Sequence, residues 1–262
     1  MTAASRDSGI ATRRNASGCH AAQRIPARKV VTVTQSELRN PHLDQLIAEL
    51  QRRSTDQIVD IRDHFTARAE RGEALDPGTI DDDATRFLAD KFVALDHDKA
   101  LFCHRLCLAL RAKCAVEVGS SYGVSTLYLA QAIHLVATED GEPGVVIGTE
   151  HEPAKAATAR KHLAAAGLDG YVDLREGDLR ETLLHIDQPI DFALIDIWPV
   201  MARPAIELIA PHLRRGAIVI VDNTENRPPS YRDLFDFIDD PVNGFTTQTL
   251  PFEGGLDMAV KL

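Results

Sequence analysis

The chain has 262 residues, of which 44% are apolar, enough for one domain of ordinary size with an additional segment. Its formal net charge is −10, and residues 1–30 hold six basic side chains against one acid, which leaves about −15 on the remainder. This acidic body disfavours nucleic acid as a partner, and the absence of a long apolar run disfavours a membrane, so we expect a small-molecule ligand.

Residues 1–30 combine basic residues with turn formers and show little periodic apolar pattern, which predicts a disordered basic tail. The chain shows no apolar core of a secretory signal and no C-x-x-C pair among its four cysteines. Both features predict a cytoplasmic protein with reduced thiols.

Helical periodicity dominates the following part of the chain. Apolar residues recur at helical spacing over 42–71, with a break expected near Ser54, and two more helices fit 83–95 and 97–111. We therefore expect a helical cap region over 31–111, followed by a ligand-binding domain over 112–262.

From residue 114 short β-branched runs alternate with helical stretches. The predicted strands are 115–118, 145–148, 171–174, 192–195 and 217–221, and the predicted helices are 124–136, 153–166, 179–185 and 200–213. A helix at 230–239 and an antiparallel hairpin of strands 243–250 and 256–262 complete the chain. The pattern predicts an α/β fold, a doubly wound, Rossmann-like, mostly parallel seven-stranded sheet with helices on both faces and an N-terminal helical extension.

The loop after the first strand, from Glu117 to Thr126, is the first candidate for a ligand site. Gly119 and Gly123 remove side chains where a ligand has to approach the backbone. The G-x-x-x-G spacing lacks the third glycine of the dinucleotide fingerprint and the lysine of a phosphate-binding P-loop. It therefore indicates a ligand without a pyrophosphate.

Acidic residues end the next two strands. Glu150 follows the second strand, where a carboxylate can accept the two hydroxyls of a ribose, and Asp178 follows the third, where an adenine ring would lie. Either residue alone is equally explained as part of a helix cap. Because three ligand-compatible strand ends lie side by side, one shared site is favoured over unrelated caps.

A possible cation site follows from the ends of the fourth and fifth strands, where Asp196 and the pair Asp222-Asn223 stand. Adjacent parallel strands lie about 5 Å apart, so these oxygens can converge on one ion. Two carboxylates and an amide carbonyl suit Mg²⁺ or another divalent cation, which would stabilise an ionised hydroxyl as a nucleophile. The alternative is that they are only strand-end acids in a ligand cleft.

These motifs resemble the metal-dependent small-molecule O-methyltransferases, the group of the catechol and caffeoyl-coenzyme A O-methyltransferases. The resemblance extends from Asp98 to Leu256. It rests on Glu117-x-Gly119-x-x-x-Gly123-x-Ser125, Glu150-x-x-Pro153, Gly177-Asp178, Asp191-x-x-x-x-Asp196 and Asp222-Asn223.

The resemblance implies S-adenosylmethionine as the cofactor and assigns a role to each motif. Glu150 would bind the ribose, and His151 and Asp178 would flank the adenine. Asp196 would contact the cofactor, take part in catalysis and, with Asp222 and Asn223, bind the metal. The methionine part of the cofactor would lie on the loop residues Glu117, Gly119, Ser120, Ser121, Gly123 and Ser125.

Two positions depart from the family pattern. Catechol O-methyltransferases carry a catalytic lysine three residues after the first metal aspartate, where this chain has Pro199, and Gly254 replaces a frequent aspartate. Either the acceptor hydroxyl loses its proton to water or to another side chain, or the acceptor is not a catechol, or activity is lost. The only tryptophan, Trp198, either forms a wall of the acceptor pocket or belongs to the core.

The sequence thus predicts a metal-assisted O-methyltransferase that acts on a hydroxyl of a small acceptor. The resemblance implies a homodimer as one candidate for its oligomeric state, which the sequence leaves open. Two other interpretations stay open. One is a metal-independent or RNA-directed methyltransferase of the same fold. The other is a catalytically inactive, cofactor-binding interaction module, which Pro199 favours.

Overall fold

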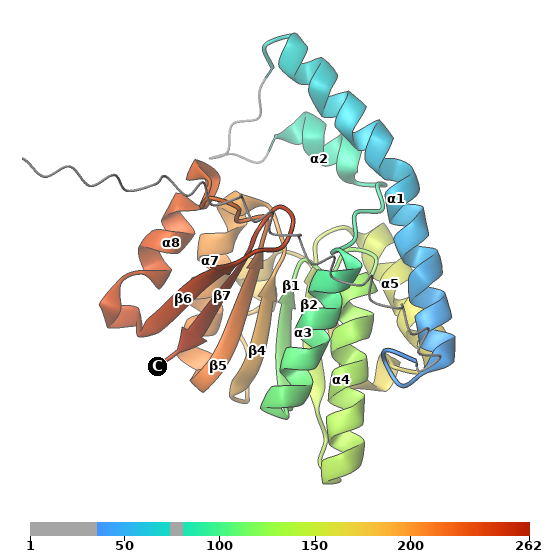
Figure 1. Cartoon of the computed structure of the whole chain (residues 1–262), viewed down its shortest axis with the longest axis vertical. Coiled ribbons are helices and arrows are strands. Elements are labelled where there is room, and N and C mark those ends of the chain that lie inside the picture. Colours follow the sequence, from blue (N-terminus) through green and yellow to red (C-terminus); the bar gives the residue numbers. More distant parts are fainter. Residues whose placement is uncertain (1–35, 74–80) are drawn as a thin grey trace, which may run out of the picture. The chain divides into compact units, whose positions relative to one another are not determined.

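A seven-stranded sheet lies at the centre of the structure, a computed structural model that describes residues 36–73 and 81–262 (Figure 1). In these residues the strand order is β3-β2-β1-β4-β5-β7-β6, with β1 to β5 parallel and β7 antiparallel to both of its neighbours. The predicted doubly wound, mostly parallel sheet with an antiparallel edge hairpin is confirmed. The strands are β1 Cys114–Val118, β2 Val145–Glu150, β3 Val172–Glu176, β4 Ile190–Ile195, β5 Leu213–Asp222, β6 Phe245–Leu250 and β7 Leu256–Lys261.

Both faces of the sheet are covered by helices, so its central strands bury apolar side chains on both faces. In β4, Phe192 and Leu194 pack into one core, whereas Ala193 and Ile195 pack into the other. The first core includes residues of α1, α3 and α4, and the second includes residues of α6, α7 and α8. The helices are α1 Pro41–Glu70, α2 Asp82–Leu88, α3 His97–Leu110, α4 Val124–Asp140, α5 Pro153–Ala166, α6 Leu179–Thr182, α7 Pro199–Ile209 and α8 Arg232–Ile238.

The helix α1 begins at a cap, because the side chain of Asn40 accepts a hydrogen bond from the backbone N–H of Leu43 at 3.2 Å. The break predicted near Ser54 is wrong, since α1 continues through it. A serine hydroxyl often competes for the backbone of its own helix, but Ser54 Oγ accepts a hydrogen bond from the N–H of Ala94 at 3.1 Å. This hydrogen bond joins residues 40 positions apart and occupies the serine hydroxyl, so the helix continues through Ser54.

The helix predicted over 83–95 is also wrong in its second half, because α2 ends at Leu88. Of the residues that follow, Phe92 and Leu95 are buried, and Gln51 of α1 donates to the carbonyl of Leu95 at 2.9 Å. Gln57 accepts a hydrogen bond from the N–H of Phe92 at 2.8 Å. The side chains of α1 thus satisfy backbone groups that a longer α2 would have used internally.

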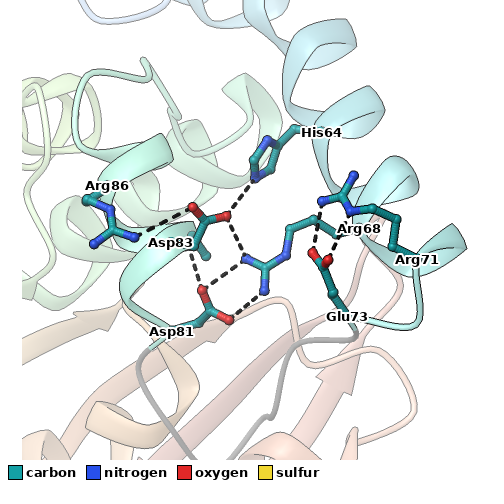
Figure 2. Close-up of polar contacts among 8 residues, drawn as sticks. His64, Arg68, Arg71, Glu73, Asp81, Asp83 and Arg86 are labelled. Atoms are coloured by element: carbon teal, nitrogen blue, oxygen red, sulfur yellow. Dashed lines mark hydrogen bonds and ion pairs between the residues drawn. The ribbon is translucent and has the colours of Figure 1, made fainter.

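The end of α1 is joined to the start of α2 by Arg68 (Figure 2). Its guanidinium donates to both oxygens of Asp81 at 2.7 and 2.9 Å and to Asp83 at 3.3 Å. Asp81 also caps α2 by accepting from the N–H of Ala84 at 2.7 Å. The hydrogen bonds from Arg68 hold the pKa of Asp81 well below its usual range.

The sequence predicts a tail over 1–30, a cap region over 31–111 and a domain over 112–262. Residues 36–262 form one compact unit, and the basic tail predicted over 1–30 lies outside the described residues. The division between a cap and a domain near residue 111 stays a prediction. Among the described residues, we find no helix with both the length and the apolar character needed to cross a membrane.

Candidate active site

The carboxyl ends of β1, β2, β3 and β4 open into one cavity of about 510 Å³, a size typical of small-molecule sites. All but two of the predicted cofactor residues line it. They are Gly119, Ser120, Ser121, Ser125, Glu150, His151, Asp178 and Asp196. The fold therefore brings together strand-end residues that are up to 77 positions apart in the sequence.

The two remaining cofactor residues, Glu117 and Gly123, lie behind the cavity wall. Glu117 is fully buried and accepts hydrogen bonds from the hydroxyls of Ser120, at 2.6 Å, and Thr126. Burial raises the pKa of Glu117, and its Oε1 atom has no hydrogen-bond partner among the described residues. Gly123 has a φ of +81°, and a Cβ atom there would lie 3.0 Å from Cβ of Ala159 on α5. Both residues therefore support the loop after β1 without lining the cavity.

Gly119 allows the loop after β1 to pass directly against the end of β4. It has a φ of +96°, and a Cβ atom at this position would lie 2.1 Å from the carbonyl oxygen of Asp196. The N–H of Asp196 in turn donates to the carbonyl of Val118 at 3.0 Å. Only a glycine fits between these two predicted site segments.

Glu150 connects the loops that follow β1 and β2. Its Oε2 accepts a hydrogen bond from the N–H of Ser121 and its Oε1 accepts one from the N–H of Glu152, both at 2.7 Å. Each carboxylate oxygen has a further lone pair with which it can accept a ligand hydroxyl. The Oγ atom of Ser121 is buried and has no partner among the described residues, although Ser121 lines the cavity. A bound ligand would satisfy it.

Asp178 fulfils both roles that the sequence left open, since it lines the cavity and also caps α6. Its Oδ1 accepts a hydrogen bond from the N–H of Arg180 at 2.8 Å. The guanidinium of Arg180 also donates to both oxygens at 3.0 Å, and these bonds lower the pKa of Asp178 to about 2. The carboxylate is therefore fixed in its ionised form beside the exposed side chain of His151.

Asp196 and Asp222 stand at the ends of the paired strands β4 and β5. Asp196 is partly buried on the cavity wall, and Asp222 is buried next to it. Burial raises the pKa of both carboxyl groups, and the charge of Asp222 raises that of Asp196 further. The site thus concentrates negative charge where β4 meets β5.

Sequence analysis missed Lys99, which lies in the first turn of α3. Its Nζ atom donates to Oδ1 of Asp222 at 2.6 Å, and only 3% of the residue is exposed. One signal was available, because Lys99, Cys103 and Cys107 are spaced by four residues and so share one helix face. All three are buried, although His97 and Asp98 in the same first turn are exposed.

The three predicted metal ligands lie near one another but do not fit a divalent ion in this arrangement. Oδ1 of Asp222 is taken by the ammonium of Lys99, and Oδ2 accepts a hydrogen bond from the amide of Asn223 at 3.2 Å. Asn223 is exposed, and neither it nor Asp222 lines the cavity. A divalent ion would be repelled by the ammonium on its own ligand, so the metal stays a prediction.

The part of the cavity that faces α2 and α7 has an apolar wall. The segment after α2 is anchored to α1 and contributes side chains there, and so does the first turn of α7. Trp198 lines this wall, in agreement with the first of its two interpretations. The apolar wall consists of Leu88, Ala89, Val93, Ala94, Leu95, Ile197, Trp198 and Met201.

The known proteins that this chain resembles are methyltransferases. A family model described as a methyltransferase domain matches residues 116–224. A catechol O-methyltransferase of Mycobacterium tuberculosis is 30% identical over 132 residues, which are 50% of this chain and 57% of that protein. The chain therefore spans less than two thirds of the length of this relative.

Solved structures extend the agreement to the fold. Cofactor-bound Rv0187 from MTB has a TM-score of 0.57 and 24% identity, over 68% of this chain and 86% of that one. An O-methyltransferase from Bacillus cereus in complex with SAH has a TM-score of 0.54 and 19% identity, over 84% and 100%. The resemblance noted in the sequence is confirmed: residues 116–224 match a methyltransferase domain, and half of the chain is similar to a catechol O-methyltransferase.

Proposed function

We propose that this chain transfers the methyl group of S-adenosylmethionine to a hydroxyl of a small acceptor. The observation that supports it most is the single cavity that collects eight predicted cofactor residues from four strand ends. In the reaction the acceptor oxygen forms a bond to the methyl carbon while the bond from carbon to the sulfonium sulfur breaks. The products are a methyl ether, a thioether and the hydroxyl proton, which leaves to solvent.

The cofactor half of the cavity offers a suitable group for each part of S-adenosylmethionine. Glu150 would accept the ribose hydroxyls with the lone pairs that Ser121 and Glu152 leave free. The hydroxyl of Ser121 would bind the methionine part, and Asp178 and His151 would border the adenine. Asp196 would stand closest to the sulfonium, because it lies between the glycine loop and the apolar wall.

The apolar half of the cavity would hold the acceptor. Its side chains are aliphatic or aromatic, so they favour an acceptor whose body is apolar and planar, such as a phenol, over a charged one. Orientation of the two substrates in one cavity converts a bimolecular step into an almost unimolecular one. Catalysis would therefore come mainly from positioning.

A divalent metal is implied by the resemblance alone. The Lys99 ammonium lies on one oxygen of Asp222 and the Asn223 amide on the other, so an ion at Asp222 would meet a positive charge there. Cytoplasmic location is supported by the buried free thiols of Cys103, Cys107 and Cys114. A homodimer stays a prediction that light scattering would test.

The proposal is tested in two steps. Calorimetric titration with S-adenosylmethionine and with its demethylated product should show binding, and ATP serves as a control nucleotide. A panel of phenols, catechols and aliphatic alcohols is then incubated with the cofactor, and mass spectrometry detects the methylated product. Failure to bind either cofactor form would disprove the proposal. Binding without any methylated product would instead favour the inactive interaction module.

A further inference from the structure

Lys99 places a positive charge inside the carboxyl edge of the sheet, between α3 and the end of β5. Its Nζ atom is 2.6 Å from Oδ1 of Asp222 and 3.9 Å from the exposed carboxylate of Asp96. A lysine is rarely buried to this extent unless a partner compensates the charge. The pair is therefore a specific feature of this edge and not a solvated surface contact.

The ammonium lies within the region from which metal ligands were predicted. A Cβ atom at Gly254 would be 3.7 Å from Nζ of Lys99 and 3.6 Å from Oδ1 of Asn223, so both atoms border the same small space. Gly254 is also the position where related sequences often carry an aspartate. Lys99 thus enters from α3 into the space framed by Asp222, Asn223 and Gly254.

A divalent ion bound to Asp222 would lie beside the Lys99 ammonium, which donates to Oδ1 of that carboxylate at 2.6 Å. The two positive charges would repel one another directly, and burial would strengthen the repulsion.

Pro199 fits the same arrangement. It takes the position of the family lysine on α7, and it forms the first turn of that helix, where a missing N–H costs nothing. A lysine is nevertheless present at this edge, because Lys99 of α3 makes a buried contact with Asp222.

We propose that Lys99 is the resident cation of this active site, so that its ammonium takes the place of a divalent metal and methyl transfer proceeds without one. The proposal rests on the proposed function. Lys99 is a positioning residue that holds Asp222. The acceptor proton leaves to solvent as described above.

The first test measures metal binding directly and does not depend on turnover. Electron paramagnetic resonance of Mn²⁺ should detect no site in the full-length wild-type protein. Lys99→Met frees Oδ1 of Asp222 and should raise Mn²⁺ affinity by about tenfold or more. Lys113→Met is the matched control, because Lys113 is an exposed lysine paired with Glu142, and it should behave like wild type.

The second test uses turnover. Wild-type activity should be unchanged in EDTA and unchanged by added Mg²⁺, and Lys99→Arg should keep more activity than Lys99→Met. If wild type binds Mn²⁺ and Asp222→Asn abolishes that binding, or if EDTA stops turnover and Mg²⁺ restores it, Lys99 is not the resident cation.

Two further measurements keep the outcomes distinct. If Lys99→Met does not fold, the wild-type Mn²⁺ measurement still decides the proposal, and the double variant Lys99→Met with Asp222→Asn removes both buried charges together. If wild type fails to bind S-adenosylmethionine, the proposed function is lost. The Mn²⁺ measurement then still decides between a lysine and a metal at this edge.

Discussion

The carboxylate of Glu150 accepts a hydrogen bond from the backbone N–H of Ser121 at 2.7 Å, across 29 residues of sequence. This bond fixes the glycine loop after β1 relative to the end of β2. A residue predicted to bind the ribose therefore also shapes the neighbouring part of the same site. Loss of its charge should affect binding more than stability.

Glu150→Gln should weaken S-adenosylmethionine binding by about tenfold or more, because a ribose hydroxyl loses a charged acceptor. The variant keeps one amide oxygen as an acceptor, so the protein should still fold. Titration calorimetry gives the affinity and thermal unfolding gives the stability. Glu176→Gln is the matched control, since Glu176 pairs with Glu150 in the sheet register but is exposed and does not line the cavity.

Gly119→Ala should destabilise the protein by about 3 kcal/mol or more, because strain at positive φ adds to the clash with the carbonyl oxygen of Asp196. Gly141→Ala isolates the strain at positive φ, since Gly141 has a φ of +70° but nothing lies within 4 Å of its added Cβ. That control should cost only about 1 kcal/mol. Denaturant unfolding measures both. Equal losses in the two variants would contradict the close approach of the loop to β4.

Local patterns were sufficient for the sheet and for the residues at its strand ends. The β-branched runs at 115–118 and 192–195 correspond to β1 and β4, because central parallel strands are apolar on both faces. The strand ends then place Glu150, Asp178 and Asp196 at one edge, whatever the details of packing. The clustering of these strand-end residues at one cavity was therefore predictable.

Long-range contacts explain what local patterns missed. Phe92 and Leu95 continue the apolar periodicity of α2, yet they are buried by packing against α1 rather than by a longer helix. Lys99 meets Asp222 across 123 residues. Periodicity within a window of a dozen residues contains no information about either contact, so the apolar wall and the buried lysine emerged only with the structure.

Asp81→Asn should loosen the attachment of α2 to α1 and raise the KM of the acceptor, because Thr85, Leu88 and Ala89 on and after α2 line the cavity. Affinity for S-adenosylmethionine should change little. Steady-state kinetics with an acceptor that the protein methylates checks the KM, and Asp82→Asn, at the exposed start of α2, is the matched control.

The ion pair of Asp81 with Arg68 also predicts that the stability of the protein depends on pH. The pKa of Asp81 is lowered in the folded protein by Arg68, so the stabilisation is present above the unfolded pKa of about 3.9 and is lost as pH falls through the folded value. The difference in melting temperature between wild type and Asp81→Asn should therefore be constant near neutrality and vanish in strong acid. A difference that stays constant down to the lowest pH would contradict the ion pair with Arg68.

Trp198 is the only tryptophan of the chain and lines the cavity, so its fluorescence should report directly on the site. Addition of S-adenosylhomocysteine should shift or quench the emission, because a ligand in the cavity displaces water from the indole. Trp198→Phe should abolish this signal while calorimetry still detects the cofactor with similar affinity. The same variant should raise the KM of the acceptor, since the indole forms part of the apolar wall. If the emission of wild type does not respond although calorimetry shows binding, the cofactor does not occupy this cavity. The positions proposed for the cofactor and for the acceptor would then both be wrong.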